Sequence, residues 1–145
     1  MLDTATRNAL VARINTLTGT EKPLWGKMNV AQMVDHCIRW EELLSGAKRN
    51  KRVLPGYLFG KMVLHSMVKD DKPLKQNVPT SKELIVTAIP DNFEQQKEKW
   101  VELLQDYEQP LFTKYVHPFL GPLNNEQKGI LACKHTDHHL RQFGR

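Results

Sequence analysis

The sequence has few cysteines and no long apolar run, the features that define disulfide-rich secreted proteins and membrane-spanning proteins. No stretch approaches the roughly eighteen consecutive apolar residues that a transmembrane helix needs. Residues 1–4 show neither the basic start nor the apolar block of a signal peptide. The two cysteines, Cys37 and Cys133, fall inside predicted helices rather than in a loop framework. We therefore expect a cytoplasmic protein with free thiols and without a membrane partner.

The sequence also lacks the signatures of a nucleic-acid-binding protein, although its formal net charge is +5. Residues 47–75 contain eight basic and two acidic residues, a surplus of six, so the rest of the chain is near −1. The basic stretch 48–52 has no interleaved aromatic residues and no zinc-finger or recognition-helix pattern. We interpret this stretch as a solvated loop and expect no nucleic-acid partner.

Apolar residues recur at helical spacing in four parts of the chain. With 145 residues, 40% of them hydrophobic and 26% charged, the chain suits one globular domain over residues 1–145. Capping boxes are predicted at Asn29 with Gln32 and at Asp91 with Glu94. The main helices are expected from Asp3 or Thr4 to Leu17, from Asn29 to about Ser45, from Asp91 to before Pro110, and from Asn124 or Asn125 to about Gln142.

The segment between the second and third of these helices is expected to be a long irregular connection. Residues 56–68 are apolar enough for a short extra helix, whereas residues 69–80 are mostly polar with two prolines and form a loop. Residues 84–89 contain β-branched residues but find no second strand to pair with, and residues 111–123 are irregular. The predicted fold class is all-α, a four-helix bundle with a long irregular central connection containing a short extra helix.

Three of the six histidines lie within five residues of one another near the end of the chain. In a helix, His135 and His139 stack one turn apart on one face, about 6 Å along the axis. Helical histidine pairs share a metal ion in this geometry. His138 is offset from both and suits the same ion least. The other interpretation is a polar helix end, where the helix dipole favours histidine.

A third histidine lies in the apolar stripe of the second predicted helix. A lone His36 there would be an ordinary hydrogen-bonded residue at the edge of the core. Ligand sites in helical bundles are built from inward side chains of facing helices, which would bring His36 to His135 and His139. Three neutral imidazoles leave coordination positions open, as in a catalytic metal site. Three further side chains are expected to line the pocket: Gln32, Trp40 and Gln142.

Two parts of the sequence resemble the signatures of the DinB/YfiT-like superfamily. The first is residues 25–37, Trp-Gly-Lys-Met-Asn-Val-Ala-Gln-Met-Val-Asp-His-Cys, and the second comprises residues 117–123 and 134–144. A turn at residues 77–80 also matches, so the resemblance spans essentially the whole chain. More narrowly, the chain is similar to a branch known only as a domain of unknown function. It departs from that branch at residues 125–128, where a tryptophan is expected near the start of the last helix.

The resemblance implies a four-helix bundle with a divalent metal ion, most often nickel or zinc, held by His36, His135 and His139. Members include thiol-dependent transferases that use low-molecular-weight thiols, and hydrolases, and they commonly form homodimers. The resemblance therefore implies a metal-dependent thiol transferase or hydrolase acting on a small molecule, with a thiol as cosubstrate of the transferase. The alternative is a non-catalytic metal- or ligand-binding bundle. The sequence lacks a His-Glu-x-x-His pattern, which excludes the metalloprotease mechanism, and it identifies no general base.

Overall fold

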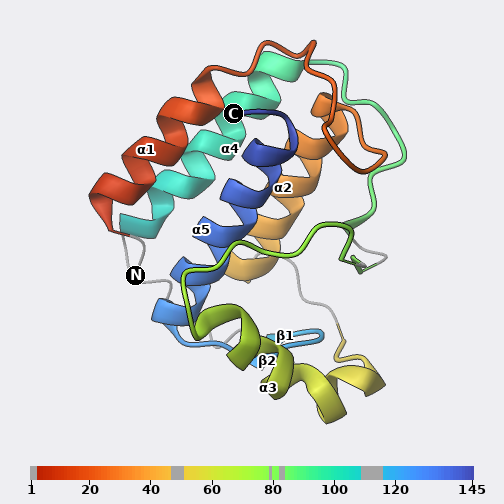
Figure 1. Ribbon diagram of the computed structural model, residues 1–145, viewed down its shortest axis with the longest axis vertical. Coiled ribbons are helices and arrows are strands. Elements are labelled where there is room, and N and C mark those ends of the chain that lie inside the picture. Colours follow the sequence, from red (N-terminus) through yellow and green to blue (C-terminus); the bar gives the residue numbers. More distant parts are fainter. Residues whose placement is uncertain (1–2, 47–50, 79, 82–83, 109–115) are drawn as a thin grey trace.

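Four helices pack side by side along the molecule, and a fifth lies across one end (Figure 1). The computed structural model describes residues 3–46, 51–78, 80–81, 84–108 and 116–145. The bundle consists of α1 (Thr4–Asn15), α2 (Val30–Ser45), α4 (Phe93–Gln105) and α5 (Asn125–Gln142). The end is formed by α3 (Leu54–Val68) and an antiparallel hairpin of β1 (Val116–His117) and β2 (Gly121–Pro122). The predicted all-α bundle with an extra central helix is confirmed.

The two helices that carry the histidine triplet both begin with a capping box. In α2, the Asn29 side chain accepts from the Gln32 amide at 2.8 Å, and the Gln32 side chain accepts from the Asn29 amide at 3.1 Å. Asn124 and Gln127 make the same pair of bonds at the start of α5. These bonds satisfy amides that the first helical turn leaves free. They fix where each helix starts and hence which residues face the other helix.

The second expected capping box, Asp91 with Glu94, is wrong. The cap of α4 is one residue later, because the Asn92 side chain accepts from the Gln95 amide at 3.0 Å. Asparagine and aspartate cap helices about equally well, so the sequence does not discriminate between the two neighbours. Glu94 lies in the first turn, where the helix dipole favours a carboxylate and where it pairs with Lys97 at 2.7 Å.

Other helix ends differ from their predicted positions by a few residues. α1 is capped by Asp3, one of the two predicted caps, but it ends at Asn15 rather than Leu17. α4 ends at Gln105 and continues as a short 3-10 turn, η2 (Asp106–Glu108), while its expected end before Pro110 lies outside the described residues. The hairpin of β1 and β2 falls where an irregular segment was expected. Strands of two residues are too short to give an alternating pattern in the sequence.

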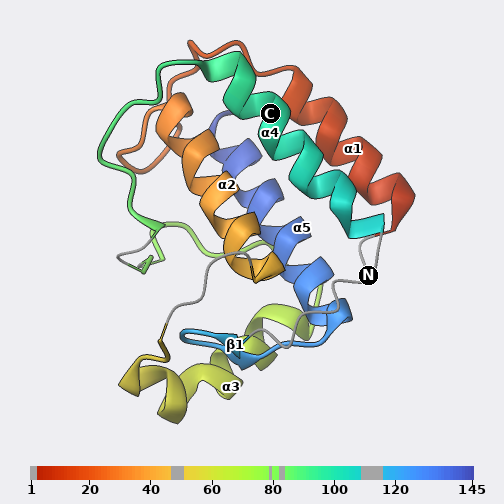
Figure 2. The same ribbon diagram turned by 180° about the vertical axis from the view of Figure 1, so that it is seen from behind.

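The extra helix α3 begins at Leu54, two residues before the predicted start, with Pro55 in its first turn, where proline is tolerated. Its two glycines face the hairpin. A Cβ atom at Gly56 would lie 2.6 Å from the Phe119 carbonyl oxygen, and one at Gly60 would contact the same oxygen even more closely. The absence of side chains at both positions lets α3 pack directly against the hairpin, which lies between α3 and the bundle in Figures 1 and 2.

Two apolar clusters hold the molecule together. One joins α1, α2, α4 and α5; its largest members include Ile14, Met33, Trp100, Leu104 and Leu140. The other joins the end of α2 to α3, the hairpin and the start of α5; its members include Trp40, Leu64, Tyr107, Leu120 and Leu131. Both cysteines are free thiols, Cys37 buried and Cys133 half-buried. No helix among the described residues is both long and apolar enough to cross a membrane.

Candidate metal centre

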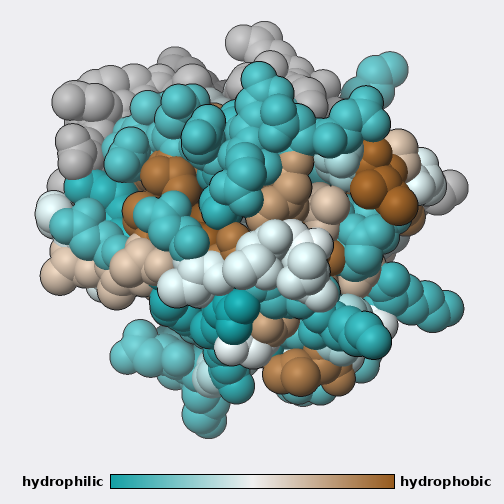
Figure 3. Space-filling view, turned by 90° about the horizontal axis from the view of Figure 1, so that it is seen from above, coloured by the Kyte–Doolittle hydropathy of each residue, from teal (hydrophilic) through white to brown (hydrophobic). Residues whose placement is uncertain are grey.

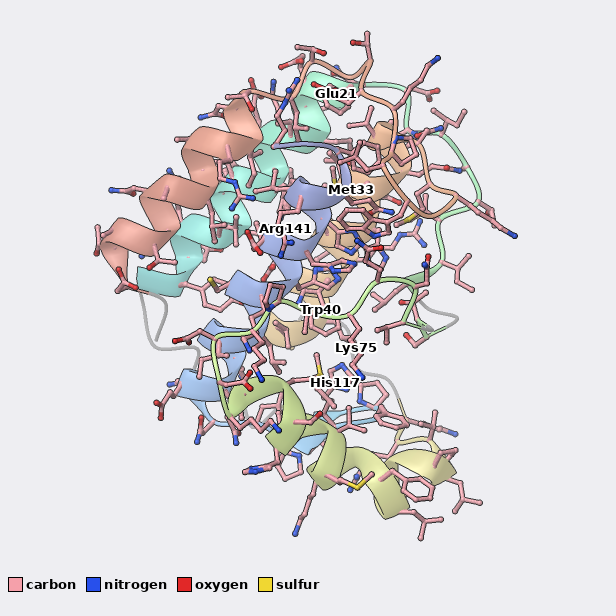
Figure 4. The ribbon with its side chains drawn as sticks, viewed as in Figure 1. Glu21, Met33, Trp40, Lys75, His117 and Arg141 are labelled. Atoms are coloured by element: carbon pink, nitrogen blue, oxygen red, sulfur yellow. The ribbon has the colours of Figure 1, made fainter. Side chains whose placement is uncertain are left out.

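Three buried imidazoles meet between α2 and α5. His36 comes from α2, and His135 and His139 come from successive turns of α5. One ring nitrogen of each lies within 4.8 Å of the others, and the Nε2 atoms of His36 and His135 are 3.1 Å apart. Side-chain nitrogens gather in this part of the bundle, between the labelled Met33 and Trp40 in Figure 4. The structure thus brings together the three residues that the sequence singles out as ligands.

The spacing of the three nitrogens is close to what one shared ion requires. Zinc–imidazole bonds are about 2.0–2.1 Å long, so ligand nitrogens on one ion lie within about 4 Å of one another. The His36–His135 pair satisfies this limit, whereas the 4.8 Å span of the whole group exceeds it by about 0.8 Å.

Hydrogen bonds fix the tautomer of two of the three rings. The Nδ1 atom of His36 lies 2.9 Å from the Leu84 carbonyl oxygen, which can only accept, so Nδ1 carries the proton. The Nδ1 atom of His139 lies 2.8 Å from Oε1 of Gln142, whose Nε2 donates to the Trp25 carbonyl at 2.7 Å. This second bond sets the orientation of the amide. Both imidazoles therefore present an unprotonated Nε2, and outer partners of this kind are typical of metal-ligating histidines.

The third ring, His135, supplies a test of whether a cation fits. Its Nδ1 atom is buried and has no hydrogen-bond partner among the described residues, and its Nε2 atom faces the unprotonated Nε2 of His36. A proton on Nδ1 would leave two lone pairs facing each other at 3.1 Å, whereas a proton on Nε2 would leave the buried Nδ1 lone pair without a donor. A cation between the rings removes the first conflict. Trp40 stacks on His135 with ring centroids 4.3 Å apart and holds the plane of the ring.

Burial keeps the three imidazoles neutral. It is the largest cause that lowers the pKa of His36, places the pKa of His135 well below its ordinary value, and lowers the pKa of His139 to about 3. For His135 and His139, repulsion from a neighbouring imidazole lowers the pKa further. The neutral ring is the form that binds metal ions, so these side chains need to lose no proton at neutral pH.

The sequence matches the model of a known protein family. The family model of the DinB superfamily matches residues 3–143. The chain belongs to the DinB superfamily. The resemblance seen in the sequence is thereby confirmed, and the narrower assignment to one branch stays a prediction. No curated protein and no solved structure matches the chain.

In this DinB-superfamily protein, the loop before α2 supports the group of three histidines through Gln142. The Leu24 amide donates to the Gln142 backbone carbonyl at 2.7 Å, and the Trp25 carbonyl accepts from its side chain. The next residue, Gly26, has φ +81°, and a Cβ atom there would lie 2.6 Å from the Gln142 side-chain nitrogen. Only glycine combines this backbone conformation with so close an approach. Gly26 was not singled out from the sequence as a support of the site, although it lies within the first family signature.

The other expected pocket residues have different neighbours. Trp40 stacks on a candidate ligand, as described above. Gln32 is used by the capping box of α2, and its Nε2 atom lies 3.5 Å from the Val86 carbonyl, a long contact. His138 is half-buried outside the group of three, with its ring 5.7 Å from Trp25 and 5.0 Å from His139. The described contacts therefore place one aromatic wall and one amide, Gln142, directly against the histidines.

His117 lies outside the group of three and was not predicted as a site residue, although it belongs to the second family signature. Its Nδ1 atom accepts from the amides of Phe119 and Leu120 at 3.1 and 3.0 Å, so it shapes the hairpin. Its ring lies 5.7 Å from the ring of Trp40, edge to face. Burial lowers the pKa of His117 to about 4, so this imidazole is neutral too. The hairpin thus contacts the tryptophan that covers His135.

Proposed function

We propose that this protein is a divalent-metal-dependent enzyme in which His36, His135 and His139 hold one ion. It acts on a small molecule, as a thiol-dependent transferase or as a hydrolase. The observation that carries the proposal is the convergence of three buried neutral imidazoles, two of them with Nδ1 already engaged by outer partners. Three nitrogen ligands leave positions for water, thiol or substrate. Imidazole ligands favour zinc or nickel over magnesium or calcium.

The chain's own residues have separable roles in this chemistry. When bound, a divalent ion would lower the pKa of a water molecule or thiol at its open positions. The deprotonated water or thiol would be a nucleophile near neutral pH. The Leu84 carbonyl and the Gln142 amide hold the ligand rings in one tautomer. Trp40 fixes the plane of His135 and keeps water from its face.

A non-catalytic metal- or ligand-binding bundle is the second candidate function, and one observation favours it. Within the described part of the chain, the group of potential ligands contains three histidines and no carboxylate that could act as a nearby base. The two acidic residues next to ligands in sequence are engaged elsewhere: Asp35 pairs with Arg39 at 2.8 Å and Asp137 pairs with Arg13 at 2.8 Å. Among the described residues, neither of these carboxylates is free to act as a base beside the three histidines.

Metal analysis of protein purified without a histidine tag tests the site. We expect about one zinc or nickel ion per chain. We expect His36→Ala to lose it, because two histidines bind far more weakly than three. His138→Ala is the matched control, since it removes a neighbouring imidazole outside the group, and it should keep the ion. Absence of metal from all three proteins after incubation with zinc or nickel would contradict the proposal.

Activity assays then separate the two candidate functions. Metal-loaded protein is tested with low-molecular-weight thiols plus electrophiles, and with ester and amide substrates, each against His36→Ala. Turnover that the variant loses supports an enzyme. A metal-loaded protein that turns over none of these substrates favours the binding module.

A further inference from the structure

Helix α3 presents large apolar side chains to solvent. Between residues 53 and 62, six of them are exposed: Val53, Leu54, Tyr57, Leu58, Phe59 and Met62. Leu58 and Met62, one turn apart, are 73% and 65% exposed. Contiguous apolar surface of this kind usually marks an interaction site on a protein.

The packing of α3 explains why its apolar side faces outward. Gly56, Gly60 and Leu64 are the buried positions of the helix, and the glycines lie against the hairpin backbone. At 100° per residue, Leu58 and Met62 lie on the opposite side of the helix, and α3 itself lies at one end of the molecule's long axis (Figures 1 and 2). The other end of that axis is mainly hydrophilic, with small separate hydrophobic patches (Figure 3). The apolar surface is a property of the α3 end.

The same segment carries only positive charge. Residues 47–69 contain six lysine and arginine residues and no aspartate or glutamate. Of these, Lys51, Lys61 and Lys69 are exposed, and Arg52 stacks over the Tyr57 ring at 4.0 Å. A second copy of the chain docked on this face would place like charges against each other. The surface of a bilayer with anionic headgroups is complementary to this segment, because it offers negative charge above apolar acyl chains. Helices that lie in a membrane interface combine apolar and basic residues in this way.

We propose that α3 binds the surface of a membrane rich in anionic lipids. Leu58, Met62 and Phe59 enter the boundary between headgroups and acyl chains, and Lys61 lies at the level of the lipid phosphates. The contact is peripheral, because no described helix could span a bilayer. It departs from the sequence-based expectation of no membrane partner, which considered only spanning segments. It does not depend on the metal centre.

Sedimentation with lipid vesicles tests the apolar part of the contact. Wild-type protein should sediment with vesicles of phosphatidylcholine mixed with phosphatidylglycerol. Leu58→Ser combined with Met62→Ser should weaken this binding about tenfold or more, because two apolar anchors are lost. Leu24→Ser combined with Ile89→Ser is the matched control, since these residues are 69% and 64% exposed elsewhere on the molecule. The control should bind like wild type.

Charge reversal tests the electrostatic part. Lys61→Glu should weaken binding at least about fivefold, whereas Lys22→Glu, the same change at an exposed site outside residues 47–69, should have little effect. Vesicles of phosphatidylcholine alone should bind weakly, and salt should weaken binding to the anionic vesicles.

Three results would overturn the proposal. They are no binding to anionic vesicles, equal binding to neutral vesicles, and equal loss of binding in the matched controls. Light scattering after size-exclusion chromatography tests whether a second copy of the chain covers this face instead of a membrane. A dimer that the Leu58/Met62 variant converts to monomer would show that a second copy covers this face. Circular dichroism checks that each variant is folded.

Discussion

The orientation of single side chains decides whether three histidines form a metal site. His139 is held by Gln142, which is in turn held by the Trp25 carbonyl. The donor and acceptor ends of that amide are both used, so its orientation and the tautomer of His139 depend on each other. Gln142 is therefore a positioning residue in this account, one bond removed from the ion.

Replacing Gln142 should weaken metal binding without removing a ligand. Gln142→Ala leaves His139 Nδ1 without its acceptor, and losses of outer partners typically lower metal affinity about 10- to 100-fold. Competition with a chromogenic chelator measures the affinity. Arg141→Ala is the matched control, because Arg141 directly precedes Gln142 and its side chain is half-exposed. This variant should bind metal like wild type. Equal affinity of Gln142→Ala and wild type would contradict the positioning role.

At the scale of elements, the site depends on how α2 and α5 are set against each other. The sequence contains most of that information: the box of Asn29 with Gln32 marks the start of α2, and Asn124 is one of the two residues predicted to cap α5. The helical period then brings His36, His135 and His139 to inward positions. Backbone partners such as the Leu84 carbonyl could not be predicted, because any residue type provides them. The choice of Asn92 over Asp91 as a cap could not be predicted either, because asparagine and aspartate cap helices about equally well.

A second contact between elements links α2 to η2. The Tyr107 hydroxyl donates to Glu41 Oε2 at 2.7 Å, and Glu41 is 1% exposed. Burial raises the pKa of Glu41 to about 8, although the tyrosine hydrogen bond opposes this change. Because its pKa is raised, the folded protein keeps a carboxyl proton that the unfolded chain loses near the ordinary pKa of 4.5. Glu41 therefore favours folding at low pH, and this contribution is lost as pH rises from about 4.5 to about 8.

Unfolding by urea at pH 6 and pH 8.5 measures this effect. Metal-free wild-type protein should lose stability between these pH values through Glu41, by on the order of a few kcal/mol. Glu41→Gln cannot titrate and should lose less stability over the same interval. Glu42→Gln, at the next position on the same helix, is the control and should behave like wild type. Parallel pH curves for Glu41→Gln and wild type would show that the Glu41 pKa is not raised.

For the whole molecule, the three buried histidines make stability depend on pH. The three histidine pKa values are lowered by burial, so only the unfolded chain takes up protons as pH falls below about 6.5. The histidine contribution to stability is therefore complete above that pH and is lost as pH falls toward the folded-state values. A bound ion adds to stability, by about 2.7 kcal/mol at a free concentration one hundred times its Kd.

X-ray absorption spectroscopy of the zinc-loaded protein tests the central claim most directly, because it reports the atoms bound to the ion. We predict three imidazole nitrogens at about 2.0–2.1 Å, with the remaining positions filled by oxygen ligands. His135→Ala and His139→Ala should each reduce the imidazole count by one, and His138→Ala should leave it unchanged. A spectrum with sulfur ligands, or with the same imidazole count in His135→Ala as in wild type, would contradict the account.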